Sequence, residues 1–193
     1  MKFFNHLFGK NKKNKDDHEQ SPFLSKESDP KEIQFAKNYT IKGGKFIFCE
    51  NKTEVLYYFN QILLENGWEE KDLSCNNKLL NEYFQIKINN ENSITNVEVL
   101  SCEFLIANKG SILLCKKQLD TRKLDEIPEN LVIIAQNNQF VSDLSEAMTR
   151  LNSKYTNIPT NISTINAFDP NSEIDFLSYG STSKNVYLLV QEK

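Results

Sequence analysis

Apolar residues along most of the chain follow two periodicities, one typical of strands and one typical of helices. KFIFCE (residues 45–50), LVIIAQ (131–136) and NVYLLV (185–190) are compact apolar runs and predict strands. The run at 131–136 is continuous enough to predict a strand that is covered on both faces. Between residues 55 and 63, apolar residues recur at the i, i+1, i+4, i+7 and i+8 positions, which predicts the buried face of a helix.

Local signals mark where the elements begin and end. Asn51, with Glu54 three residues later, is a typical helix start, and Gly67 is a typical helix end. The remaining patterns predict a helix from 31 that ends at Gly43-Gly44, a strand near 73–75, a helix at 79–84, two adjacent strands around Gly110-Ser111 and a strand at 161–168. They also predict an amphipathic helix at 141–151, whose first turn is stabilised by Asp143 and Glu146. Strands and helices mostly alternate, which implies an α/β fold with a mainly parallel central sheet and helices on its faces.

The polar segment 1–24 differs from the globular composition of residues 25–193, which we expect to form a single domain. Apolar residues at helical spacing between 3 and 8 are followed by lysines between 10 and 15, which is typical of a helix that touches an anionic membrane surface through residues 1–15. The alternatives are a mobile leader and a helix that docks on its own domain or on a partner subunit. The apolar part is too short for a signal peptide, and no run approaches the roughly 20 apolar residues of a membrane span.

Composition and the placement of chemically versatile residues exclude several functions. The net charge of -3 gives no basic field, so we expect no nucleic-acid partner. The four cysteines form no CxxC pair, so their spacing predicts neither an iron-sulfur cluster nor a zinc site. Each cysteine lies among apolar residues, as expected of buried thiols in a reducing cytoplasm, with a disulfide or a reactive nucleophile as the alternative.

Both histidines, His6 and His18, lie in the polar N-terminal segment. The globular part therefore has no histidine to act as a general base or metal ligand, which argues against Ser-His-Asp, Cys-His and histidine-metal catalysis. The sequence shows no convincing catalytic constellation, which favours a binding role. Whether the protein is an enzyme stays open. We expect no cofactor and no metal.

Two glycine-serine turns are the candidate ligand site. Gly110 permits a close backbone approach and Ser111 adds a hydroxyl, with Asn108 as a polar orienting group. A second group repeats this chemistry and adds a positive charge: Gly180, Ser181, Thr182, Ser183 and Lys184. Together they predict one shallow pocket for a carboxylate or phosphate; the alternative is a pair of hairpin turns with solvated hydroxyls.

Four stretches resemble the LUD-domain family of lactate-utilisation proteins, in particular the small subunit type without iron-sulfur clusters. The resemblance covers roughly residues 31–191 and rests on order and spacing. It is carried by GGKFIFCENKTEVLYYFNQIL (43–63), CEFLIANKGSILL (102–114), LVIIAQNNQFVSDLSEAMTRL (131–151) and YGSTSKNVYLLV (179–190). Asn108 stands where the family often has glutamate, STINAF (163–168) stands in for a Gly-Pro-Ser-Arg-Thr stretch, and Tyr179-Gly180-Ser181 replaces histidine-glycine-proline.

The resemblance implies a three-layer sandwich of the NagB, ribose-phosphate isomerase and CoA-transferase type. It also implies a cytoplasmic accessory subunit in the oxidation of L-lactate to pyruvate, which binds a small carboxylate or docks to partner subunits of an oxidoreductase complex that carry iron-sulfur clusters. The alternative from the broader fold group is a stand-alone transferase or isomerase that acts on a phosphorylated or CoA-linked metabolite.

Overall fold

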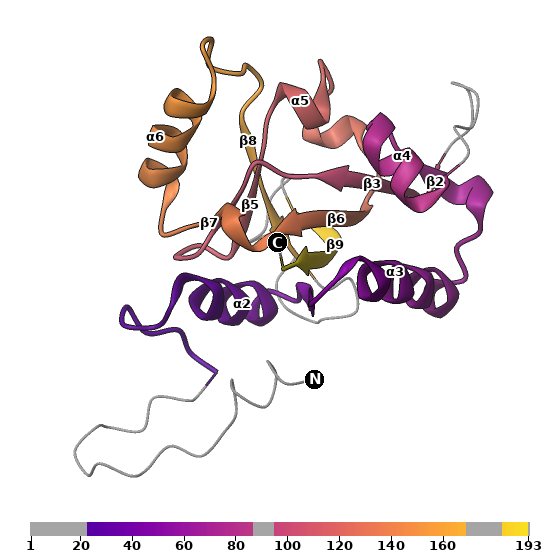
Figure 1. Cartoon of the computed structure of the whole chain (residues 1–193), viewed down its shortest axis with the longest axis horizontal. Helices are drawn as coiled ribbons and strands as arrows, with labels where there is room; N and C mark the ends of the chain where they lie inside the picture. Colours follow the sequence, from indigo (N-terminus) through magenta and orange to yellow (C-terminus); the bar gives the residue numbers. More distant parts are fainter. Residues whose placement is uncertain (1–22, 87–94, 169–182, 193) are drawn as a thin grey trace.

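The computed structural model describes residues 23–86, 95–168 and 183–192. The predicted N-terminal membrane helix lies outside these ranges. Figure 1 labels most of the helices and strands. In order, they are α2 (Lys31–Ile41), β1 (Lys45–Cys49), α3 (Lys52–Asn66), β2 (Leu73–Ser74), α4 (Lys78–Phe84), β3 (Val97–Ser101), β4 (Phe104–Ile106), β5 (Ser111–Leu114), α5 (Lys116–Leu119), β6 (Asn130–Gln136), β7 (Phe140–Val141), α6 (Leu144–Lys154), β8 (Ser163–Ala167) and β9 (Ser183–Gln191), with the 3-10 turn η3 (Asn137–Gln139) between β6 and β7.

The helix ends follow the capping signals of the sequence. Asn51 Oδ1 accepts a hydrogen bond from the Glu54 amide at 3.0 Å and starts α3, and Gly67 ends it in the left-handed conformation, with φ 66°. Helix α6 begins at Leu144, because Asp143 caps it by accepting from the Glu146 amide at 2.8 Å. The predicted helix start at 141 is therefore wrong: Val141 belongs to strand β7.

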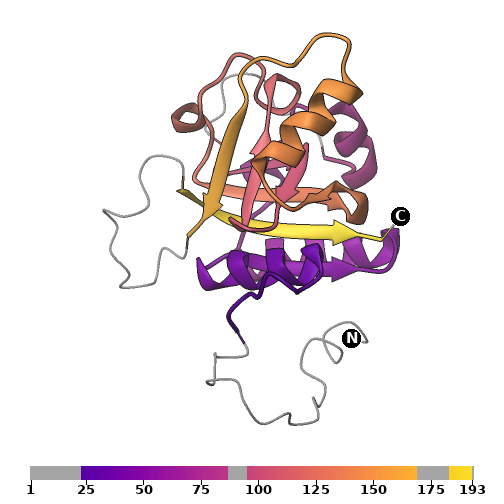
Figure 2. The same cartoon turned by 90° about the vertical axis from the view of Figure 1, so that its left-hand side faces the viewer.

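A parallel sheet with the strand order β2-β3-β6-β9-β1 forms the body of the molecule. Val132 of β6 pairs with Val99 on one side and Tyr187 on the other. A second, mixed sheet continues from the beginning of β9 through β8, β5, β4 and β7. Figure 2 shows β9 as the long yellow strand that belongs to both sheets.

Alternate side chains of the parallel sheet enter different hydrophobic clusters. On one face, Val132 of β6 packs with Val55 and Phe59 of α3, and residues of α4 border this cluster. On the other face, Leu131 and Ile133 pack with residues of α2, α5 and the mixed sheet. This alternation with period two is what a strand that is buried on both faces requires.

A third cluster lies on the far side of the mixed sheet. Phe104, Ile106 and Leu113 of the β4–β5 hairpin pack there against Ala147 and Leu151 of α6. The mainly parallel sheet with helices on both faces confirms the fold class predicted from the sequence. None of the helices in the described part of the chain combines the length and apolar character needed to cross a membrane.

Candidate functional site

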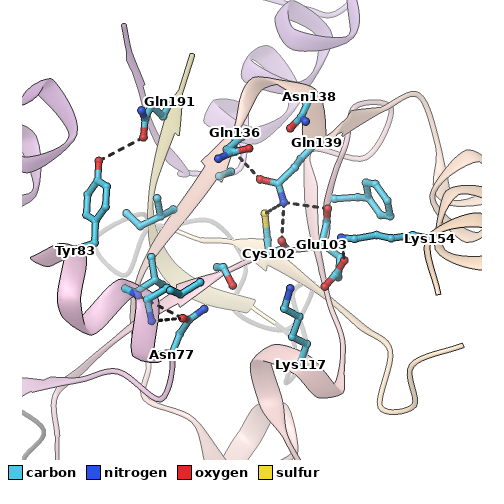
Figure 3. A pocket seen from close by; sticks show the side chains of 16 residues that line it. Asn77, Tyr83, Cys102, Glu103, Lys117, Gln136, Asn138, Gln139, Lys154 and Gln191 are labelled. Carbon is cyan, nitrogen blue, oxygen red and sulfur yellow. Dashed lines mark hydrogen bonds and ion pairs between the residues drawn. The ribbon is translucent and has the colours of Figure 1, made fainter. Parts of the chain in front are cut away.

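The carboxyl-terminal ends of three adjacent parallel strands border a cavity of about 540 Å³ (Figure 3). The last residues of β3, β6 and β9, which are Ser101, Gln136 and Gln191, all line it. This edge is the usual place for a ligand in an open α/β sheet, because loops and helix ends gather there around unpaired strand ends. Strand order and cavity position together make it the candidate site.

One wall of the cavity is mostly apolar and comes from α4. Leu79, Leu80 and Tyr83 of this helix line the cavity. Asn77 holds the helix start in place, because its Oδ1 accepts hydrogen bonds from the Leu79 and Leu80 amides at 2.9 and 3.3 Å. The Leu79 side chain is 75% exposed, so that this wall presents apolar surface that the protein itself leaves uncovered.

The opposite wall is polar and centres on the Glu103 carboxylate, which is buried. It accepts hydrogen bonds from Lys154 Nζ at 2.7 Å, Tyr155 Oη at 2.9 Å and Gln118 Nε2 at 3.1 Å. Burial by itself would raise the pKa of Glu103, but the bonds from Lys154, Gln118 and Tyr155 lower it below its ordinary value. Glu103 is therefore ionised at neutral pH, and its oxygens are already occupied.

Gln139, in the turn η3, fixes the rim between the strands. Its Nε2 donates to the carbonyls of Cys102 and Glu103 at 2.6 and 3.1 Å, and its Oε1 accepts from the Gln136 amide at 2.6 Å. One amide side chain thus joins the end of β6 to the segment between β3 and β4. These bonds satisfy backbone N–H and C=O groups at the strand ends, where pairing between strands has stopped.

The cavity carries a surplus positive charge. Of its lining residues, Glu103, Lys117 and Lys154 are charged at neutral pH. Burial raises the pKa values of the Cys102 thiol and the Tyr83 phenol, which keeps both groups neutral. Lys154 is paired with Glu103, whereas Lys117 is exposed and forms no ion pair with a carboxylate of the described residues. Figure 3 shows Lys117 reaching toward the cavity.

These groups suit the binding of an anion. The Glu103 carboxylate is surrounded by donors and positions Lys154, and the buried Cys102 thiol stays protonated, which makes it a poor nucleophile. Within residues 23–86, 95–168 and 183–192, no group of three or more His, Cys, Asp or Glu side chains is placed to hold a metal ion.

The Gly110-Ser111 turn connects the antiparallel strands β4 and β5 and packs against the backbone of α2. Gly110 has a φ of 55°, and a Cβ atom on it would lie 2.5 Å from the backbone carbon of Asn38 and the backbone nitrogen of Tyr39. Asn38 Nδ2 also donates to the Ala107 carbonyl at 2.8 Å. The glycine is thus needed for a helix contact, and Ser111 is buried at the start of β5.

The structure brings some of the predicted site residues together. Asn166 of β8 pairs with Ser111 on one side and with Ser183 on the other, so these serines lie two strands apart. Gly180 and Ser181 lie outside the described residues. Lys184 is buried, and its ammonium group donates to the Ile127 carbonyl at 3.2 Å and to Glu129 Oε1 at 2.9 Å.

The cation next to this turn is Lys42, which is half-buried. Its Nζ donates to the Lys109 carbonyl at 2.6 Å and to Asn166 Oδ1 at 3.4 Å. Asn108 is exposed, and its backbone N–H donates to the Ser142 carbonyl at 3.0 Å. Asn108 and Lys109 follow β4, whereas Glu103 of the cavity precedes it, so this part of the predicted site and the cavity lie at opposite ends of the strand. Ligand binding by the predicted residues stays a prediction.

Sequence reasoning missed the cavity residues because they come from distant segments. One signal was available: Glu103 is a lone charge within the apolar run from Leu100 to Ala107. A carboxylate in such a run is expected to be buried with partners. Its main partner, Lys154, is 51 residues away and has no distinguishing pattern around it.

Comparisons with known proteins agree with this architecture. The family model of the LUD domain matches residues 77–190, a range that includes nearly all of the cavity-lining residues. A crystal structure of a DUF162 family protein from Deinococcus radiodurans is similar to this chain with a TM-score of 0.60 and 12% sequence identity, over 83% of this chain and 96% of that one. At this identity the likeness concerns the fold. No curated protein matches the sequence significantly.

Proposed function

Since the chain belongs to the LUD-domain family, which is associated with lactate utilisation, we propose that it is an accessory subunit of a lactate-utilisation system and binds an organic carboxylate. Partner subunits with iron-sulfur clusters would carry the electrons released when L-lactate is oxidised to pyruvate. The chain would then position or sense a carboxylate, and it would dock to these partners.

The observation that carries this proposal is the surplus positive charge of the cavity at the carboxyl edge of the sheet. Lys117 is the charge that no carboxylate of the described residues neutralises, whereas Lys154 is paired with Glu103. A carboxylate ligand would complete the charge balance of the cavity. Charge-assisted hydrogen bonds to an ammonium group are among the stronger polar contacts that a site can offer.

Ligand binding is tested by thermal shift and calorimetry with L-lactate, pyruvate and the neutral analogue lactamide. We expect the two carboxylates to stabilise the protein and lactamide to have no effect. Lys117→Met should weaken carboxylate binding about tenfold or more, because one charge-assisted contact is lost. Lys116→Met is the matched control, since Lys116 is the exposed neighbour that does not line the cavity. Equal behaviour of both variants would contradict the proposal.

The accessory role is tested separately by affinity purification of the tagged protein from its native cell. Recovery of iron-sulfur oxidoreductase subunits in fixed ratio is expected. If the protein is recovered without any redox subunit, the accessory role is wrong, although carboxylate binding in the cavity would stand.

A second candidate function is favoured by one observation, the acidic side chain buried in the wall of the cavity. A transferase or isomerase that acts on a phosphorylated or CoA-linked metabolite would use such a carboxylate, and Glu103 is the residue in that place. Stabilisation by phosphate esters or CoA, but not by lactate or pyruvate, would favour this enzyme. The donors that already surround Glu103 favour the binding role instead.

A further inference from the structure

We propose that the ligand of this cavity has two parts: a carboxylate head that pairs with Lys117, and an apolar or aromatic body, much larger than a methyl group, that packs on α4. This inference rests on the proposed carboxylate-binding function and names the class of carboxylate. It follows from the size of the cavity, from the distribution of apolar and polar side chains around it, and from the exposure of Leu79.

The cavity is too large for lactate alone. Its volume of about 540 Å³ lies within the range of sites that hold ligands of drug or cofactor size. Lactate occupies the space of only a few water molecules at roughly 30 Å³ each, and would fill about a quarter of the cavity. The rest would hold water against Leu79, Leu80 and Ile134, which are apolar.

The charged side chains of Glu103 and Lys154 lie away from the apolar residues of α4, and the Phe104 ring adjoins Lys154 on their side. Figure 3 shows Tyr83 and Asn77 of the α4 region on one side and Glu103 and Lys154 on the other. The Leu79 side chain, 75% exposed, stands on the α4 side, where an apolar ligand body would remove it from water. A ligand that satisfies both sides must therefore be amphipathic.

Lys117 is the group best suited to the head of this ligand. The ammonium of Lys154 already donates to Glu103 at 2.7 Å, and the Gln139 amide is occupied by three backbone groups. The carboxylate therefore pairs with Lys117, and the body extends from there toward Leu79 and Leu80.

Calorimetric titration of the full chain with three probes tests this arrangement. L-lactate supplies the head alone, L-3-phenyllactate supplies the head and an aromatic body, and 3-phenyl-1-propanol supplies a body without charge. We expect phenyllactate to bind at least about tenfold more tightly than lactate, because the buried ring adds apolar area. Phenylpropanol should bind more weakly than phenyllactate by a similar factor.

Two variant pairs assign the parts of the ligand to the two walls. Leu79→Asn should weaken phenyllactate binding much more than lactate binding, because lactate has no body to pack on α4. Leu64→Asn is its control, because Leu64 is 74% exposed on α3 and does not line the cavity. Lys117→Met should weaken both acids, whereas Lys116→Met should weaken neither. All four positions are exposed, and circular dichroism verifies that each variant folds.

The outcomes separate this inference from the function on which it rests. Equal affinities for lactate and phenyllactate, or equal losses for both acids in Leu79→Asn, would overturn the two-part ligand while carboxylate binding stands. If neither acid binds and Lys117→Met changes nothing, the proposed function fails, and the two-part ligand fails with it.

Discussion

At Gly110 the β4–β5 hairpin lies directly against the backbone of helix α2. Glycine is required here for two separate reasons. The backbone is left-handed, and a Cβ atom would clash with the backbone of Asn38 and Tyr39. Gly67, at the end of α3, has a similar φ of 66° but no atom within 4 Å of the Cβ position. The two glycines therefore allow conformational strain to be separated from steric contact.

We expect Gly110→Ala to lower the free energy of unfolding by more than about 3 kcal/mol, since a methyl group there would push α2 away from the hairpin. Gly67→Ala should cost only about 1 kcal/mol, the strain of a left-handed alanine. Urea denaturation of the two variants measures the difference. Equal losses would show that the contact between Gly110 and α2 has no energetic weight.

Among the elements, α2 and α6 are joined by a network of hydrogen bonds and ion pairs at Glu146. Lys31 Nζ of α2 donates to both carboxylate oxygens at 2.8 Å, and Arg150 Nη2 donates to Oε1 at 2.7 Å. The Ser142 amide and hydroxyl donate to Oε2 at 2.7 and 2.6 Å. The bonds from Lys31 and Ser142 lower the pKa of Glu146 from 4.5 to about 2.

This network should make stability depend on pH. A carboxylate whose pKa is lowered by folding contributes stability above its ordinary value of 4.5, and loses it as the pH falls toward 2. We expect Glu146→Gln to cost about 1 kcal/mol at pH 7, because solvent screens a partly exposed network. The difference from the wild type should shrink as the pH falls below 4.5.

Denaturation curves at several pH values measure this difference. The control is Glu65→Gln on α3, since Glu65 is exposed and has no ion-pair partner among the described residues. A Glu146→Gln difference that stays constant from pH 7 to the acid range would rule out this linkage.

At the scale of the whole molecule, β9 connects the hydrophobic clusters on both faces of the parallel sheet. Val186, Leu188 and Val190 pack in one cluster, and Tyr187 and Leu189 pack in the other. Strands of both sheets pair with β9. We therefore expect a substitution that destabilises the cluster on one side of β9 to destabilise the cluster on the other side as well.

We expect Leu188→Ala to lower the free energy of unfolding by about 3 kcal/mol, as for other fully buried leucines. Trp68, the single tryptophan, packs on the other face against Tyr187 with ring centres 5.9 Å apart. Its fluorescence and the circular dichroism should shift together in the variant if both faces unfold as one unit. A fluorescence transition that keeps its wild-type midpoint would show that the two clusters unfold independently.

The extent to which the sequence predicts the molecule differs between fold and site. The run at 131–136, the cap at Asn51 and the terminating Gly67 are local signals, so β6 and both ends of α3 were predictable. Val141 fits the apolar spacing of the following helix, and only its pairing with Ile106 of β4 reveals it as a strand residue. Pairing partners are not encoded in local periodicity.

The site was less predictable because chain order hides its geometry. Gly110 stands out in the sequence, yet its glycine is explained by the backbone of Asn38, more than 70 residues earlier. Lys117 and Lys154 look like ordinary surface lysines until α5 and α6 bring them to one cavity. Their surplus charge depends on tertiary structure alone.

The central position of β9 has a consequence for biosynthesis. Among the described strands, β9 is the last to be translated, yet it lies between β6 and β1. Until residues 183–191 leave the ribosome, the emerging chain exposes unpaired edges of two apolar strands, which are templates for aggregation. Nascent chains that stall before Ser183 should therefore depend on chaperones, and premature stop codons there should yield insoluble or degraded products.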